Sequence, residues 1–279
     1  MQLRILLSVL VLFSLSCRKR DIPVPSYIHI AAYDFETKAG QGTNRQLFEY
    51  VNVFINDNSV GNYTLPATFP VLATGNITVD VRPVIKEFAR SHALFNMVDP
   101  YLVNVNLKEG EIDTIKPVFR YLPNVKFVFI EDFNDTVTSF QLTQGSLDTF
   151  YIKSELSQSS DSSPFLEIPL GAAQNSFQIE SEATFEIPRD RRNVYLEFEY
   201  QTNFTFTIGL TNLTNTGLER LPSVSPFPSN EWKKGYVQLN DEVFNSRNNV
   251  SFKLYFQGLN TQTPDALLRL DNLKIIFRE

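Results

Sequence analysis

The sequence predicts an all-β chain in which two β-sandwich domains follow one another. The 279 residues include 24 Phe and 11 Tyr, and aromatic side chains favour the pleated, half-buried surface of a sheet. Apolar and polar residues alternate with a period of two through most of the chain, which is typical of strands with one buried face. Clusters of turn-forming residues separate these runs, and the length is that of about two domains.

The charge and the reactive residues exclude several classes of function. The chain has 25 Lys and Arg against 31 Asp and Glu, a net charge of −6, whereas a nucleic-acid binder needs a basic surface, so we expect no nucleic-acid partner. Cys17 is the sole cysteine, which rules out a disulfide framework or a cysteine-based zinc site within the chain. The two histidines, His29 and His92, lie far apart in the sequence. This inventory predicts that the chain is not an enzyme.

The first residues have the pattern of a targeting segment. Arg4 gives a positive start, and the apolar run from Ile5 to Phe13 is shorter than the roughly 20 residues that a membrane-spanning helix needs. The run ends in Ser14-Leu15-Ser16-Cys17. This ending resembles the lipobox of bacterial lipoproteins, which implies a signal peptide at residues 1–16 that is cleaved before an acylated Cys17. The alternative is an ordinary secretory signal in which the cysteine is incidental.

The lipoprotein resemblance implies a location. Two or more acyl chains, such as palmitate, are needed for stable attachment to a membrane. Residue 18 is Arg and not the Asp that often retains lipoproteins at the inner membrane, so the resemblance implies the outer membrane, with the periplasmic or surface side left open. Residues 17–26 then form a tether, in which Pro23 and Pro25 disfavour helix and regular sheet.

Residues 27–123 form the first expected domain. Alternating runs at 48–55, 60–65, 77–81 and 101–107 predict strands, and Asn56-Asp57-Asn58-Ser59 predicts a hairpin turn. After Pro83, apolar residues recur at helical spacing between Val84 and Phe95, so this segment is either one short helix or an irregular crossover. The hairpin, the connection framed by Pro66 and Pro70 and the strand after Gly75 resemble small immunoglobulin-like or PEGA-type modules of bacterial envelope proteins. Such modules act as spacers or contact surfaces.

Residues 124–279 form the second expected domain, after a hinge at Pro123-Asn124. Long alternating runs at 194–200, 204–210, 250–256 and 268–277 predict half-buried antiparallel strands, for which two stacked sheets are the common arrangement. The segments 129–133, 194–200, 230–237 and 270–275 together resemble the galactose-binding-like jelly roll of carbohydrate-binding modules. Together, the two resemblances imply an immunoglobulin-like β-sandwich followed by a jelly-roll β-sandwich. The jelly roll is expected to present a glycan-binding surface.

Three carboxylates in this second domain are candidate calcium ligands. In the jelly-roll family a calcium ion often ties the first strand to the last, and Glu131, Asp132 and Asp271 fall in matching places. Calcium binds six to eight oxygen ligands. The alternative is that these carboxylates accept hydrogen bonds from backbone N–H groups at strand ends. A glycosidase acid/base pair needs two carboxylates across an open cleft, which nothing in the sequence indicates. Apart from this calcium we expect no cofactor.

Four aromatic residues are candidate platforms for stacking a sugar ring. Tyr195 and Tyr255 are opposite in phase to Leu196 and Leu254, so we expect them to be exposed. Tyr236 is a further candidate. Trp232 belongs to a motif in which, by resemblance, the indole generally packs under the sheet, and it is either a core residue or a stacking platform.

The sequence therefore predicts a non-catalytic envelope lipoprotein, anchored to the membrane through Cys17, whose jelly roll binds a ligand, most simply a glycan. The alternative is a structural or assembly subunit of an outer-membrane protein complex, because a flat sandwich face serves protein contact equally well. A hydrolase would need a catalytic pair that the sequence does not offer.

Overall fold

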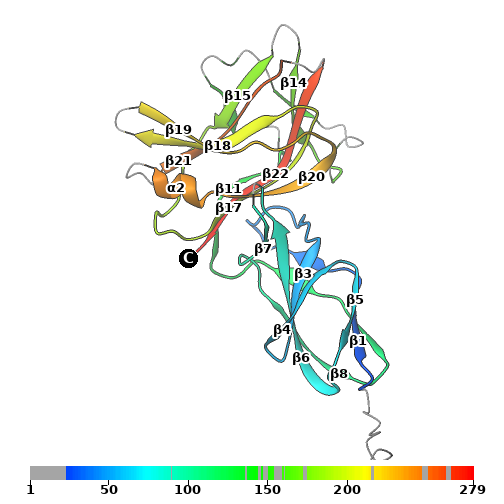
Figure 1. The fold of residues 1–279 in the computed structure, drawn as a ribbon. Helices are drawn as coiled ribbons and strands as arrows, with labels where there is room; N and C mark the ends of the chain where they lie inside the picture. The colour runs from blue at the N-terminus through cyan, green and yellow to red at the C-terminus, as the bar shows by residue number, and fades with distance from the viewer. Residues whose placement is uncertain are drawn as a thin grey trace, which may run out of the picture.

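The computed structural model describes residues 23–279 except for residues 89, 136, 144–145, 147–149, 154–158, 160, 172–174, 215–216, 247–250 and 262–264. The predicted signal peptide and Cys17 lie outside the described residues. The described chain is all-β, as predicted, with one set of sheets built from its N-terminal part and two face-to-face sheets from its C-terminal part (Figure 1). No helix among the described residues has the length and apolar character needed to cross a membrane.

The N-terminal unit contains three sheets, in the orders β5-β1-β9, β10-β2 and β4-β3-β6-β7, with β8 also paired to β6. Its strands are β1 (Ser26–Ile30), β2 (Asp34–Glu36), β3 (Tyr50–Ile55), β4 (Asn58–Thr64), β5 (Ala67–Val71), β6 (Gly75–Lys86), β7 (His92–Leu94), β8 (Tyr101–Leu107), β9 (Ile112–Ile115) and β10 (Val118–Arg120). Along β3 every second residue is buried, so the predicted alternation places Val51, Val53 and Ile55 in the core. Whether this unit is immunoglobulin-like stays a prediction.

The hairpin between β3 and β4 turns where the sequence predicts it. Asn56 and Asp57 have φ angles of 47° and 64°, and positive φ at both central residues is the mark of the tight turn that matches the twist of a hairpin. Asn and Asp tolerate this conformation better than other non-glycine residues. The turn thereby fixes the register in which Ile55 pairs with Asn58.

The segment after Pro83 is neither a helix nor an irregular crossover. It continues β6 to Lys86 and returns as β7, with Val84 paired antiparallel to Leu94. The helical spacing is misleading because its apolar residues serve two different cores. Ile85 is buried in the N-terminal unit, whereas Phe88 stacks at 5.9 Å on Phe198 of the C-terminal unit.

The C-terminal unit is a sandwich of two antiparallel six-stranded sheets. The seam sheet has the order β13-β14-β22-β17-β20, with β11 paired to β22; the distal sheet has the order β12-β15-β21-β18-β19, with β16 paired to β21. The strands are β11 (Val125–Glu131), β12 (Phe140–Leu142), β13 (Tyr151–Lys153), β14 (Phe165–Leu170), β15 (Ser176–Ser181), β16 (Phe185–Glu186), β17 (Val194–Thr202), β18 (Phe206–Thr214), β19 (Gly217–Val224), β20 (Ser229–Gln238), β21 (Ser251–Leu259) and β22 (Ala266–Arg278). A short helix, α2 (Asn240–Asn245), lies in the connection from β20 of the seam sheet to β21 of the distal sheet.

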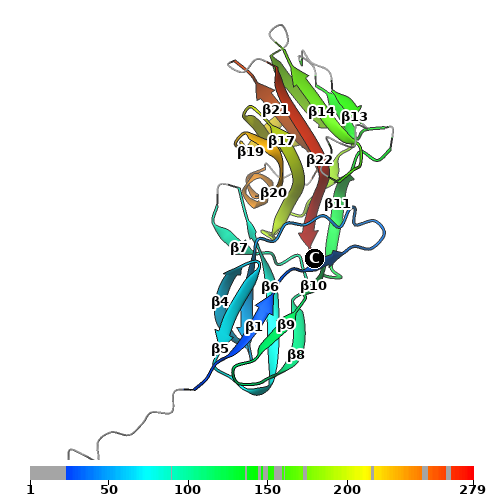
Figure 2. The same ribbon diagram turned by 90° about the vertical axis from the view of Figure 1, so that its right-hand side faces the viewer.

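The two units meet on the outer face of the seam sheet. Tyr195, Tyr236 and Ile276, which point away from the interior of the sandwich, are buried in the hydrophobic cluster of the N-terminal unit. The segment at residues 37–49 crosses the lower end of this sheet (Figure 2), where Thr43 donates a hydrogen bond of 2.7 Å to Asn272. The N-terminal unit thus covers this part of the seam sheet, and the distal sheet lies on the other side of the sandwich.

Candidate functional site

Two of the predicted stacking platforms are buried, contrary to expectation. Tyr195 and Tyr255 are only 2% and 1% exposed. Both side chains point away from the interior of the sandwich, as their positions along the strands predict, but other parts of the chain cover the outer face of each sheet at these two residues. The N-terminal unit covers Tyr195, whose hydroxyl donates a 2.7 Å hydrogen bond to Glu87. The Tyr255 ring packs against Gly209, with the Arg220 guanidinium 5.7 Å from its centroid.

The other two aromatic candidates lie on the seam sheet. Tyr236 is buried and donates a hydrogen bond of 2.7 Å to Gln46 of the N-terminal unit, so it holds the units together instead of facing a ligand. Trp232 is half-buried outside the inter-sheet core, with its ring 5.6 Å from that of Phe165 in an edge contact. It lines a cavity of about 720 Å³ between the units. Of the four candidates, Trp232 thus lines this cavity, and Tyr236 lines a neighbouring one of about 490 Å³.

The candidate calcium ligands do not assemble into a metal site. Among the described residues no group of three or more His, Cys, Asp or Glu side chains is placed to hold a metal ion. Glu131 instead accepts hydrogen bonds from the backbone N–H groups of Phe133 and Ser139, at 2.9 and 2.6 Å. Asp132 and Asp271 each accept one from a nearby backbone N–H group as well. These bonds fit the alternative role, in which the carboxylates accept hydrogen bonds from backbone N–H groups, although Asp271 lies within β22 and not at its end.

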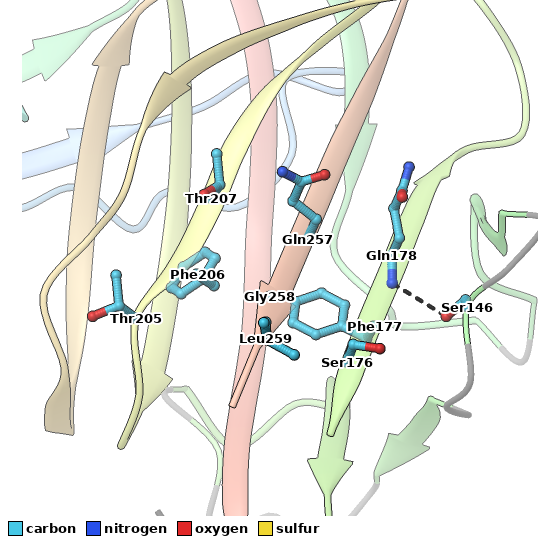
Figure 3. Close-up of a pocket in the computed structure, with 10 residues that line it drawn as sticks. All are labelled: Ser146, Ser176, Phe177, Gln178, Thr205, Phe206, Thr207, Gln257, Gly258 and Leu259. Atoms are coloured by element: carbon cyan, nitrogen blue, oxygen red, sulfur yellow. Dashed lines mark hydrogen bonds between the residues drawn. The ribbon is translucent and has the colours of Figure 1, made fainter. Parts of the chain in front are cut away.

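The outer face of the distal sheet carries a cavity of about 350 Å³ (Figure 3). Gln178 of β15, Gln257 of β21 and Thr207 of β18 lie side by side in the strand register. Figure 3 shows the amide side chains of both glutamines on this face, with the Gln178 backbone N–H donating a 3.2 Å hydrogen bond to Ser146. The described residues that line the cavity carry hydroxyl, amide and apolar groups and no ionised side chain.

The floor of this cavity is aromatic. Phe177 and Phe206 are buried beneath the polar row and line the same cavity. Gly258 makes room for them, because a Cβ atom there would lie 2.6 Å from the Phe177 ring and 2.8 Å from the Phe204 ring. The absence of a side chain at residue 258 therefore lets the rings close up under the cavity.

A hydrogen-bond donor at this cavity has no partner. The side-chain Nε2 of Gln178 is buried and makes no hydrogen bond in the described part of the chain. On the same sheet, Glu180 Oε2 and Thr211 Oγ1 are also buried without a partner. Buried polar groups are nearly always hydrogen-bonded, so each exception calls for an explanation. A ligand bearing hydroxyl groups would supply the missing partner for Gln178.

A buried polar network joins the two units beneath Tyr236. Glu197 of β17 accepts hydrogen bonds from Tyr121 at 3.0 and 2.9 Å and from Gln46 at 2.5 Å. Burial raises the pKa of Tyr121 well above its usual value, and the Glu197 charge raises it further. Burial also lowers the pKa of Lys274 to about 8, against the opposing effect of Glu197. The sequence does not reveal this network, because Gln46 and Glu197 are 151 residues apart.

The chain resembles carbohydrate-binding modules among solved structures. No family model and no curated protein matches it. A family 29 carbohydrate-binding module in complex with mannohexaose is 11% identical, with a TM-score of 0.37 over 55% of this chain and 91% of that chain. A carbohydrate-binding module of promiscuous specificity from the β-sandwich superfamily is 11% identical, with a TM-score of 0.41 over 90% of this chain and 98% of that chain. A family 30 carbohydrate-binding module is 12% identical, with a TM-score of 0.38 over 55% of this chain and 85% of that chain. The sandwich described above rests on the sheets themselves, and these likenesses carry no argument about a ligand.

Proposed function

We propose that this chain is a non-catalytic glycan-binding protein of the cell envelope and that its ligand lies on the distal sheet. The observation that carries the proposal is the uncharged cavity in which the unpartnered Gln178 amide stands beside Gln257 and Thr207, above the Phe177 and Phe206 rings. Binding sites for small molecules typically combine an apolar lining with a few polar groups that fix orientation.

The chemistry of this cavity matches a neutral sugar. Amides and hydroxyls donate to and accept from the hydroxyl groups of a saccharide, and an unfilled donor such as Gln178 Nε2 discriminates in favour of a ligand that can pair it. Since no ionised group lines the cavity in the described residues, a charged ligand would lose its hydration without compensation there.

The test is a titration of the purified chain with neutral oligosaccharides, chosen from a glycan array and measured by calorimetry. Gln178→Ala should weaken binding about tenfold, which corresponds to about 1.4 kcal/mol, because it removes the hydrogen bonds of one amide. Gln257→Ala should act in the same direction. Asn106→Ala, an exposed position on β8, is the control and should leave the affinity unchanged. A Gln178→Ala affinity equal to that of the control would refute the distal-sheet site.

Membrane attachment through Cys17 is part of the same proposal. It is supported by the short apolar run that ends at this cysteine. Cys17→Ser should move the protein from the envelope pellet to the soluble fraction, because the acyl chains have no other attachment site in this motif. Undiminished sedimentation of an uncleaved Cys17→Ser chain would contradict the anchor. Recovery of a stoichiometric outer-membrane partner together with absence of any glycan binding would favour the assembly-subunit alternative.

A further inference from the structure

A groove runs along the seam between the two units. It consists of the cavity of about 720 Å³ that Trp232 lines and a second cavity of about 490 Å³. The two cavities are adjacent because Leu47, Lys233 and Lys234 line both of them. The combined groove lies between β20 and the segment that precedes β3, on the opposite sheet from the distal cavity.

The feature of this groove that calls for a ligand is the ammonium group of Lys234. The side chain is only 3% exposed, and Nζ lies 3.9 Å from the nearest Glu197 oxygen, which is beyond hydrogen-bond distance. No other described group accepts a hydrogen bond from it. Glu197 is already paired with Tyr121 and Gln46. A buried ammonium has three N–H donors, and leaving them unfilled is costly.

We propose that the groove binds a glycan containing a uronic acid and that the sugar carboxylate accepts hydrogen bonds from Lys234. The inference rests on the proposed function only in taking a glycan as the ligand, and its site is a different one. The flexible stem of the lysine lets Nζ turn from Glu197 towards the groove when a carboxylate arrives. The result is a charge-assisted hydrogen bond, which is about twice as strong as a neutral one.

The walls of the groove define this ligand class. Trp232 and Tyr33 line the larger cavity, and Tyr200 and Phe227 line the smaller one. Aromatic faces of this kind pack well against the apolar face of a sugar ring. Asp34 and Glu36 also line the larger cavity, but each is already in an ion pair, with Lys116 and Arg120, so their charges are balanced within the chain. A carboxylate on a sugar ring with an apolar face fits both the buried, unpartnered Lys234 ammonium and the aromatic wall.

The test uses Trp232, the only tryptophan of the chain, as the reporter. Trigalacturonate added to the purified chain should produce a saturable change in tryptophan fluorescence, and neutral galactotriose should produce none at the same concentrations. Lys234→Met should weaken trigalacturonate binding at least about tenfold. Lys233→Met is the matched control, because Lys233 lines both cavities but is 50% exposed and pairs with Glu231. It should weaken binding no more than about threefold.

The remaining outcomes separate this inference from the distal site. Lys234→Gln keeps a polar side chain, and a native thermal transition of this variant with the same loss of binding would show that folding is not the cause. A Gln178→Ala chain should still respond to trigalacturonate as the parent chain does, although it binds neutral glycans about tenfold more weakly. The inference is overturned if trigalacturonate gives no saturable response, if Lys233→Met and Lys234→Met weaken binding equally, or if acetate or phosphate displaces trigalacturonate at equal concentration.

Discussion

At the scale of single residues, Gly235 lies where side chains of the two units pack against each other. A Cβ atom at this position would lie 2.5 Å from the ring of Phe198, in the sandwich core, and 2.5 Å from the ring of Phe88, which reaches over from the N-terminal unit. The two rings stack on each other at 5.9 Å beside the bare backbone. Glycine is required here for space and not for backbone conformation.

Gly235→Ala should therefore destabilise the chain by about 1–3 kcal/mol, the usual cost of overpacking a filled core. Gly171→Ala is the matched control, because nothing lies within 4 Å of the Cβ position at residue 171. Urea unfolding followed by circular dichroism measures both variants. Equal midpoints for the two alanine variants would mean that Phe88 can move aside freely and does not hold the units together.

The stacking candidates show what residue-level sequence reasoning can establish. Strand phase correctly predicts that Tyr195 and Tyr255 point away from the interior of the sandwich. It cannot predict exposure, because the surfaces that cover these rings come from distant segments. Glu87 lies 108 residues before Tyr195, and Gly209 is on a different strand from Tyr255. The uncharged cavity around Gln178 was missed for the same reason, although an alternation of Gln178 and Gln257 with buried Phe residues could have indicated it.

At the scale of elements, the segment at residues 37–49 acts as a clamp on the seam sheet. Arg45 donates to Glu199 of β17 at 2.9 Å. Gln46 donates to both Tyr121 and Glu197 and accepts from Tyr236. This segment has no regular structure until it reaches Tyr50, so its conformation depends on these side-chain bonds.

Gln46→Ala should release this clamp. It removes three hydrogen bonds to a buried network and leaves Glu197 with Tyr121 as its remaining close donor, at a cost of about 1–3 kcal/mol. Hydrogen exchange should become faster in residues 43–49 and in β17. Gln41→Ala, in the same segment, loses only an exposed bond to the Lys38 backbone and should exchange like the parent chain. Unchanged protection of β17 in the Gln46 variant would show that the clamp contributes nothing.

Most strands could be predicted from the sequence because apolar and polar residues alternate within each strand, which gives it one buried and one exposed face. The runs at 101–107 and 194–200 emerge as β8 and part of β17. Residues 84–95 were mispredicted because Ile85 and Phe88 belong to different cores, so their spacing reflects two independent surfaces. The spacing of apolar residues indicates secondary structure only where they are all buried on the same surface, and it misleads where one segment packs against both units.

At the scale of the whole molecule, the charges buried between the units make stability depend on pH. Lys274 has a folded-state pKa of about 8, lowered from its usual 10.5 by burial. The unfolded chain therefore binds more protons than the folded chain between these two values, and the free energy of unfolding should rise as the pH increases from 8 to about 9.5. Each pKa unit corresponds to about 1.4 kcal/mol, so the rise between pH 8 and 9.5 can reach at most about 2 kcal/mol.

Urea unfolding at several pH values between 7.5 and 9.5 measures this dependence. In Lys274→Met the rise should be absent, because no titrating group remains at that position. Lys108→Met, which alters an exposed pair with Glu111, should keep the rise of the parent chain. If the free energy of unfolding still rises in Lys274→Met, a group other than Lys274 causes the pH dependence. Below pH 8 the charge on Lys274 opposes folding in full, and the parent chain should show no further dependence on this residue.

The contact between the units also determines how the chain can be divided. A C-terminal sandwich produced alone would present Tyr195, Tyr236 and Ile276 to water and would strip Glu197 of Tyr121 and Gln46. Such a fragment exposes an apolar surface, which favours self-association. A binding domain derived from the sandwich must therefore include the preceding hundred or so residues, because the two units bury a common interface.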